Sequence, residues 1–208
     1  MKRRQFTSTS VAAVALLTNP MLFAAETKAT IGQIAPNFSA KDVNGKTVSL
    51  ADFKGKTVVL EWVNPGCPFV RKHYGASNMQ STQQEAQSKN VVWLAINSTA
   101  TDHFDYMPPA KLAVWMKEQK ANATHTLMDE DGKIGLAYGA RTTPHMYIVD
   151  GKGMLVYAGG IDSIASASAA DIPKATNYVK VAMSEIASGK PLSNTATRPY
   201  GCSVKYKS

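Results

Sequence analysis

Residues 57–70 read Thr-Val-Val-Leu-Glu-Trp-Val-Asn-Pro-Gly-Cys-Pro-Phe-Val, and the architecture of the 208-residue chain is built around them. Their first half is an almost unbroken β-branched and apolar run, which is typical of a central strand buried on both faces. A three-residue loop leads to Cys67, and Pro68 favours the first position of a helix because its missing N–H needs no partner there. The stretch therefore predicts a strand and then a helix over residues 68–88, with Cys67 at the helix N-cap.

The segments on either side complete one α/β domain. Asn44-Gly45, between two short alternating runs, predicts a tight hairpin near the N-terminus. The helix after Cys67, bent near Gly75, leads to a second buried strand over 91–97. Further strands are expected at 125–128, 145–149 and 154–158, and further helices at 109–121, 133–138 and 172–187. This order predicts a mixed central sheet with helices on both faces.

The first 25 residues have the pattern of a secretory signal peptide: a basic Lys2-Arg3-Arg4 head, a short apolar run and a small pair, Ala24-Ala25, for cleavage. A disordered or helical N-terminal arm is the alternative interpretation, and the arginine pair is also compatible with twin-arginine export. No apolar run reaches the roughly 18 residues of a membrane helix. We therefore expect a periplasmic or secreted protein without stable membrane insertion after the signal is removed.

Composition limits the partners and the use of cysteine. The formal net charge is +8, and removing the three basic residues of the signal leaves +5, a surplus that favours solubility. No basic stripe interleaved with aromatic residues is present, so nucleic-acid binding is not expected. Cys67 and Cys202 are the only cysteines, too few for a disulfide scaffold or a cysteine zinc site. We expect a signal over 1–25, a domain over 26–187 and a tail over 188–208 that carries Cys202.

Cys67 is the candidate for chemistry. Only the thiolate of a cysteine is nucleophilic, and a helix N-terminus favours the anion through unpaired N–H groups and partial positive charge. Arg71 and Lys72, one turn later, would add positive field if they fold back. The alternative interpretation is an inert, buried cysteine.

Residues 61–70 resemble the active-site strand and loop of the thioredoxin superfamily, and Thr143-Pro144 with the strand after it resembles the superfamily's cis-proline segment. The lead-in from Gly32 to Lys56 resembles the redoxin branch, which holds the alkyl hydroperoxide reductase/thiol-specific antioxidant proteins and exported thioredoxin-like reductases. The similarity covers roughly residues 32–158. It implies a thioredoxin fold with an N-terminal hairpin extension.

Carried over by position, the resemblance makes Cys67 the attacking cysteine and Pro144 the cis-proline that packs on its sulfur and leaves backbone free for a substrate strand. Glu61 takes the place of a buried acid that relays protons, because a carboxyl beneath a central strand has a raised pKa. The alternative for Glu61 is a carboxylate at a solvated edge or one that caps a neighbour.

Two positions depart from the family patterns. Val70 stands where thioredoxins have their second cysteine, so the usual CxxC disulfide cannot form. Asn64 and Pro144 stand where peroxiredoxins have a hydroxyl residue and an arginine. The sequence therefore predicts a weak thiol peroxidase at most.

Cys202 can fill the gap that Val70 leaves. Pro199 and Gly201 shape a turn at this cysteine, and we hypothesise that the tail docks beside Cys67 and that Cys202 resolves its intermediates. The alternative is a static Cys67–Cys202 disulfide that stabilises the fold by about 4 to 5 kcal/mol.

The sequence thus predicts an exported thiol–disulfide oxidoreductase of redoxin type, with Cys67, Cys202, Glu61 and Pro144 as its site and with protein thiols or disulfides as partners, or else a small thiol or peroxide. The alternative is a non-catalytic binding module for a partner protein or copper. His145 is expected near Cys67, where it would stabilise the thiolate or, as the alternative, join it on a soft metal such as copper. No ligand spacing points to a metal site or a cofactor.

Overall fold

A computed structural model of the chain describes residues 28–207, so the predicted signal peptide lies outside the described residues. At its centre is a five-stranded sheet in the order β5-β4-β3-β7-β8. The strands are β3 (Val58–Trp62), β4 (Val92–Asn97), β5 (His125–Met128), β7 (His145–Val149) and β8 (Leu155–Gly159). The predicted central strand is β3, which is buried throughout and pairs in parallel with β4 and antiparallel with β7. The sheet is therefore mixed, as the sequence predicts.

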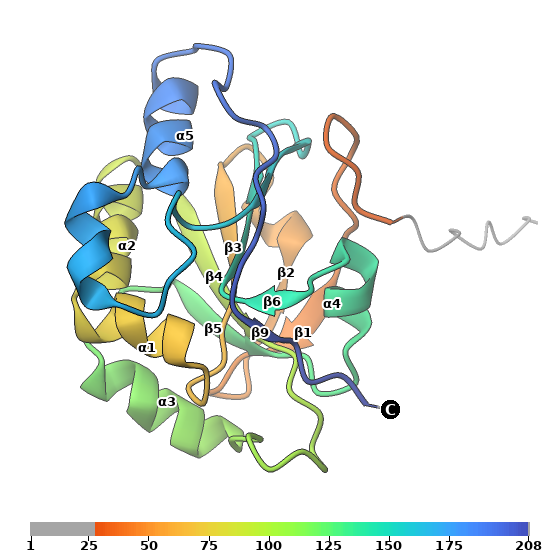
Figure 1. Cartoon of the computed structure of the whole chain (residues 1–208). Helices are drawn as coiled ribbons and strands as arrows, with labels where there is room; N and C mark the ends of the chain where they lie inside the picture. The colour runs from red at the N-terminus through yellow and green to blue at the C-terminus, as the bar shows by residue number, and fades with distance from the viewer. Residues whose placement is uncertain (1–27, 208) are drawn as a thin grey trace, which may run out of the picture.

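Helices cover both faces of this sheet (Figure 1). One face carries α1 (Pro68–Gly75), α2 (Asn78–Ser88), α3 (Pro109–Glu118) and α5 (Tyr178–Ala187). The other face carries α4 (Lys133–Tyr138), the hairpin of β1 (Ser39–Lys41) and β2 (Thr47–Ser49), and the short 3₁₀ helix η1 (Leu50–Phe53). Two apolar cores result, because alternate residues of each strand point to opposite faces.

Two predicted helices are each divided. The helix over 68–88 is two helices, α1 and α2, because Ser77 adopts a left-handed conformation with φ of 57° just after Gly75. The helix over 172–187 is a 3₁₀ helix, η2 (Ala169–Lys174), followed by α5. Pro173 lies inside η2, and Asn177 begins α5 by accepting a hydrogen bond from the Lys180 N–H at 3.0 Å.

The C-terminal tail runs back from α5 across the molecule, drawn in dark blue in Figure 1. Ala196 bridges Ala158 of β8, and the short strand β9 (Cys202–Ser203) pairs antiparallel with β6 (Thr142–Thr143). Farther on, the Tyr206 hydroxyl donates to the Ala140 carbonyl at 2.7 Å. The tail therefore returns to the sheet end where β3 leads into α1. Over residues 28–207, no helix is long and apolar enough to cross a membrane.

Candidate active site

Cys67 lies at the junction of β3 and α1, as the N-cap residue of that helix. The Asn64 side chain shapes the preceding loop by accepting a hydrogen bond from the Gly66 N–H at 2.7 Å. Cys67 is only 1 % exposed, and its Sγ donates to the carbonyl oxygen of Thr143 at 2.9 Å. Thr143 is joined to Pro144 by a cis peptide bond. The segment that resembles a cis-proline region therefore contains a cis-proline, and its backbone contacts the cysteine.

The tail brings Cys202 to the same place. Cys202 is the ladder partner of Thr143 in the β6–β9 pair, and its thiol is in hydrogen-bonding contact with that of Cys67. Both cysteines are free thiols. Gly201 permits this close approach, because its φ is +140° and a Cβ there would lie 2.1 Å from the Thr143 carbonyl oxygen. Strand β9 thus occupies backbone beside Pro144 that the sequence interpretation left free for a substrate strand.

The two thiols are shifted in opposite directions. Burial acts to raise the pKa of Cys67, but hydrogen bonds that include those from Cys202 and the Val70 N–H outweigh burial and lower it. Val70 belongs to the first turn of α1. An N–H group left unpaired at the helix start therefore helps to lower the pKa of Cys67, as the sequence predicts. Burial, the hydrogen bond with Cys67 and the charge of Cys67 together raise the pKa of Cys202 to about 11. The pKa of Cys67 therefore lies below its ordinary value and that of Cys202 above it, so Cys67 is the more readily ionised of the two thiols.

Glu61 lies on β3 with no exposed surface. Its carboxylate accepts hydrogen bonds from Trp93 Nε1 at 2.7 Å, from the Tyr74 hydroxyl at 3.0 Å and from Gln83 Nε2 at 3.3 Å. Burial raises the pKa of Glu61 to about 7, although these three hydrogen bonds act against the shift. The carboxyl is therefore in the core rather than at a solvated edge, and it can exchange a proton near neutral pH.

The prediction that His145 lies beside Cys67 is wrong. His145 projects to the other face of the sheet, where its Nδ1 accepts a hydrogen bond from the Arg141 N–H at 3.2 Å and contacts the Tyr147 hydroxyl. The physical reason is the alternation of strand residues, because His145 shares the face of Tyr147 while Cys67 belongs to the opposite core. Burial lowers the pKa of His145 to about 3, so the ring is neutral.

The basic residues after Cys67 also have other partners. Arg71 Nε donates to the Pro65 carbonyl at 2.8 Å, and Lys72 Nζ lies 3.8 Å from a carboxylate oxygen of Asp162. Hydrogen bonds, and not these cations, are therefore the cause of the lowered pKa of Cys67. Among residues 28–207, no three His, Cys, Asp or Glu side chains come together in a way that could hold a metal ion.

Asp105 is a neighbour of the site that sequence reasoning missed. Asn64 Nδ2 donates to its carboxylate at 3.5 Å, and a Cβ on Gly66 would meet that carboxylate at 2.6 Å. The Asp105 charge also contributes to the raised pKa of Cys202. Asp105 lies in the polar loop before α3, where no periodic pattern marked it. The Asn64 position, in contrast, was marked by its departure from the peroxiredoxin pattern.

The sheet order, the cysteine at a strand–helix junction and the cis-proline beside it define a thioredoxin fold. The chain belongs to the AhpC/TSA family, whose model matches residues 31–158. It is similar to the thiol-disulfide oxidoreductase ResA of Bacillus cereus, with 29 % identity over 136 residues, covering 64 % of this chain and 72 % of that protein.

Two solved structures are similar over large parts of the chain. An uncharacterized conserved protein from Geobacillus kaustophilus is 25 % identical with a TM-score of 0.74, covering 86 % of this chain and 93 % of that one. The thioredoxin domain of a thiol-disulfide oxidoreductase from Bacteroides vulgatus is 25 % identical with a TM-score of 0.50, covering 63 % and 89 %. The first of these likenesses extends beyond the residues of the family match.

Proposed function

We propose that this protein is an exported thiol–disulfide oxidoreductase of redoxin type, in which Cys67 attacks a disulfide and Cys202 resolves the intermediate. The observation that carries the proposal is the contact between two thiols, of which Cys67 has a lowered pKa and Cys202 a raised one. An attacking cysteine needs to be a thiolate, and a resolving thiol needs to reach its sulfur. The similarity to ResA supports the same class. Export is part of the proposal and is supported by the residue pattern of positions 1–25.

The reaction is a pair of sulfur exchanges. The Cys67 thiolate attacks one sulfur of a substrate disulfide, a mixed disulfide forms, and the other substrate sulfur leaves as a thiolate. Cys202 then loses its proton and attacks the Cys67 sulfur, so that the Cys67–Cys202 bond forms and the second substrate sulfur leaves. The substrate disulfide gains two electrons and two protons, and the protein loses them as its dithiol becomes a disulfide. Two equivalents of an external thiol reset the protein by the reverse exchange and leave as a disulfide.

Glu61 and Pro144 have supporting roles in this proposal. Glu61 exchanges protons beneath β3, which is supported by its burial and by a pKa of about 7. Pro144 shapes the groove in which a substrate meets Cys67, which is supported by the bond between Cys67 and the carbonyl of the preceding Thr143. Protein disulfides are the proposed substrates. Peroxide is a poorer one, because Asn64 stands where peroxiredoxins place a hydroxyl.

Removal of Cys202 should trap the reaction halfway. The Cys202→Ser variant is expected to accumulate a mixed disulfide between Cys67 and an oxidised protein such as insulin, because nothing resolves it. Mass spectrometry of acid-quenched samples would locate the bond. The matched Cys67→Ser variant should form no adduct and should lose disulfide reduction by at least about a hundredfold. Reduction of insulin by both variants at the wild-type rate would show the oxidoreductase proposal to be wrong.

A binding module with a structural disulfide is the second candidate, and the 1 % exposure of Cys67 is the observation that favours it. This candidate predicts a Cys67–Cys202 potential below about −300 mV, whereas a disulfide that turns over has a higher one. Titration of the purified protein in glutathione and dithiothreitol buffers separates the two. Copper binding that requires both cysteines would also favour the module, and elemental analysis of protein purified without reductant would detect it.

A further inference from the structure

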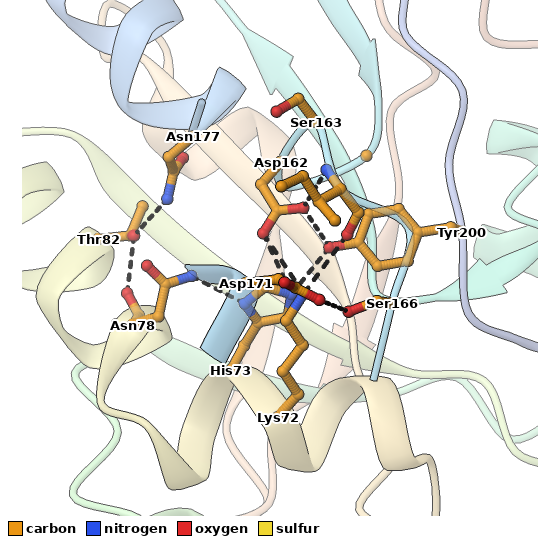
Figure 2. Close-up of polar contacts among 12 residues, drawn as sticks. Lys72, His73, Asn78, Thr82, Asp162, Ser163, Ser166, Asp171, Asn177 and Tyr200 are labelled. Atoms are coloured by element: carbon orange, nitrogen blue, oxygen red, sulfur yellow. Dashed lines mark hydrogen bonds and ion pairs between the residues drawn. The ribbon is translucent and has the colours of Figure 1, made fainter. Parts of the chain in front are cut away.

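A buried polar cluster joins α1 to the tail (Figure 2). It consists of Lys72 and His73 on α1, Asp162 in the segment after β8, and Tyr200 in the tail, and we call it the α1–tail cluster. The side chains of Lys72 and His73 have no exposed surface, and that of Asp162 is 2 % exposed. None of these residues takes part in the exchange reaction described above.

The contacts form a directed chain of hydrogen bonds. The Tyr200 hydroxyl donates its single proton to Asp162 Oδ1 at 2.5 Å, so it must accept from His73 Nε2, which lies 3.1 Å away. His73 Nδ1 in turn accepts from Asn78 Nδ2 at 2.8 Å, which assigns a neutral ring with its proton on Nε2. Burial lowers the pKa of His73 to about 4, in agreement with a neutral ring.

The second oxygen of Asp162 completes the cluster. Within residues 28–207, Asp162 Oδ2 has no hydrogen-bond partner, but it faces Lys72 Nζ at 3.8 Å and His73 Nε2 at 3.9 Å. Lys72 also lies over the Tyr200 ring, 5.6 Å from its centre, and Phe69 meets that ring edge-on at 5.8 Å. Tyr200 is thus contacted by the Lys72–Asp162 ion pair and by the ring of Phe69.

The position of this cluster relates it to the cysteines. Lys72 and His73 follow Cys67 on the same helix, and Tyr200 precedes Cys202 by two residues. Burying a charge pair carries a desolvation cost, so apolar packing would serve stability at least as well. What hydrogen bonds of fixed direction add is one defined geometry. Here that geometry relates the helix of one cysteine to the strand of the other.

We propose that the α1–tail cluster holds Cys202 in register against Cys67, with Tyr200 as the main positioning residue, and so sets how readily the two cysteines form a disulfide. The proposal rests on the exchange function proposed above, since it concerns the second sulfur exchange. Tyr200 is a positioning residue, because it acts through the placement of Cys202.

The test is the equilibrium between the dithiol and the disulfide in glutathione buffers. Tyr200→Phe keeps the ring on Phe69 but removes the hydroxyl that joins His73 to Asp162. We expect this variant to form the Cys67–Cys202 disulfide about tenfold less favourably than wild type, a shift of about 30 mV toward a more oxidising potential. Asp162→Asn, which weakens the same bond, should shift the potential in the same direction.

Tyr138→Phe is the matched control. Tyr138 is also buried and its hydroxyl also donates, to the Pro36 carbonyl at 2.8 Å, but it packs in the core on the other face of the sheet. This variant should lose some stability and keep the wild-type potential. A wild-type potential in Tyr200→Phe, or an equal shift in both tyrosine variants, would overturn the proposal.

The measurement needs no protein substrate, so it separates the two proposals. If wild-type protein fails to reduce any protein disulfide, the proposed function fails, while the effect of Tyr200→Phe on the glutathione equilibrium still decides the positioning role. If wild type reduces insulin and Tyr200→Phe has an unchanged potential, only the positioning role fails.

Discussion

Oxidation of the cysteine pair is expected to raise the free energy of unfolding by about 5 kcal/mol, because a Cys67–Cys202 bond closes a loop of about 135 residues. The gain comes mainly from the unfolded chain, whose conformational freedom the long loop restricts. The folded state changes little, since the two thiols already interact and β9 is already paired with β6. Urea unfolding of the oxidised and the reduced protein, each followed by the same optical signal, measures the difference.

The Cys202→Ser variant is the control for this measurement. It should unfold at the same urea concentration with and without reductant, close to the midpoint of the reduced wild type. A gap of less than about 1 kcal/mol between oxidised and reduced wild type would mean that bond strain or residual structure cancels the loop term. In that case contacts such as those of Tyr200 and Tyr206, rather than the cross-link, hold the tail in position.

The second large effect is the dependence of stability on the protonation of Glu61. Its pKa is about 7 in the folded protein and about 4.5 in the unfolded chain, so the folded state alone holds the proton between these values. Stability from this group is fully present below pH 4.5 and is lost as pH rises through 7. Each pH unit costs about 1.4 kcal/mol, which amounts to about 3 kcal/mol in total.

Glu61→Gln should remove this term, because the amide stays neutral at every pH. The unfolding free energy of the variant minus that of wild type is therefore expected to increase by about 3 kcal/mol between pH 4.5 and pH 8. Urea unfolding across this range measures it. Glu118→Gln, at an exposed position, is the control and should give a small difference at every pH. A flat difference for Glu61→Gln would contradict the raised pKa.

Subtracting the two curves is necessary because buried histidines act in the opposite direction. The pKa values of His73 and His145 are lowered to about 4 and about 3, so their contribution is present above pH 6.5 and is lost as pH falls toward those values. In wild type the histidine and Glu61 terms overlap between pH 4 and 7. Only the difference between Glu61→Gln and wild type isolates the carboxyl.

The central part of the fold could be predicted because local sequence determines it. The apolar run that became β3, the proline after Cys67 and the Asn44-Gly45 turn each have one favoured local structure, and all three occur where expected. The break of the last helix was also encoded, by Pro173, but periodic apolar spacing hid it.

The arrangement around the cysteines could be predicted only in part, because it depends on contacts between distant residues. His73 and Tyr200 are separated by 127 positions, and no periodic pattern relates them. The tail was expected to dock only because it carries Cys202. Strand alternation predicts the face on which His145 lies, whereas its closeness to Pro144 in the sequence suggests a position beside Cys67 that it does not occupy.

The pairing of β9 with β6 has a consequence for how large partners would reach the site. Strand β9 occupies the hydrogen-bonding edge of Thr142–Thr143. An extended polypeptide that binds to this edge must therefore compete with the protein's own tail. Its apparent affinity is then its intrinsic affinity multiplied by the fraction of molecules in which the tail is detached. Amide hydrogen exchange at Val204, whose N–H is bound to the Arg141 carbonyl, would report that fraction directly. The tail thus carries the Cys202 sulfur and also competes with large partners for the backbone beside Cys67.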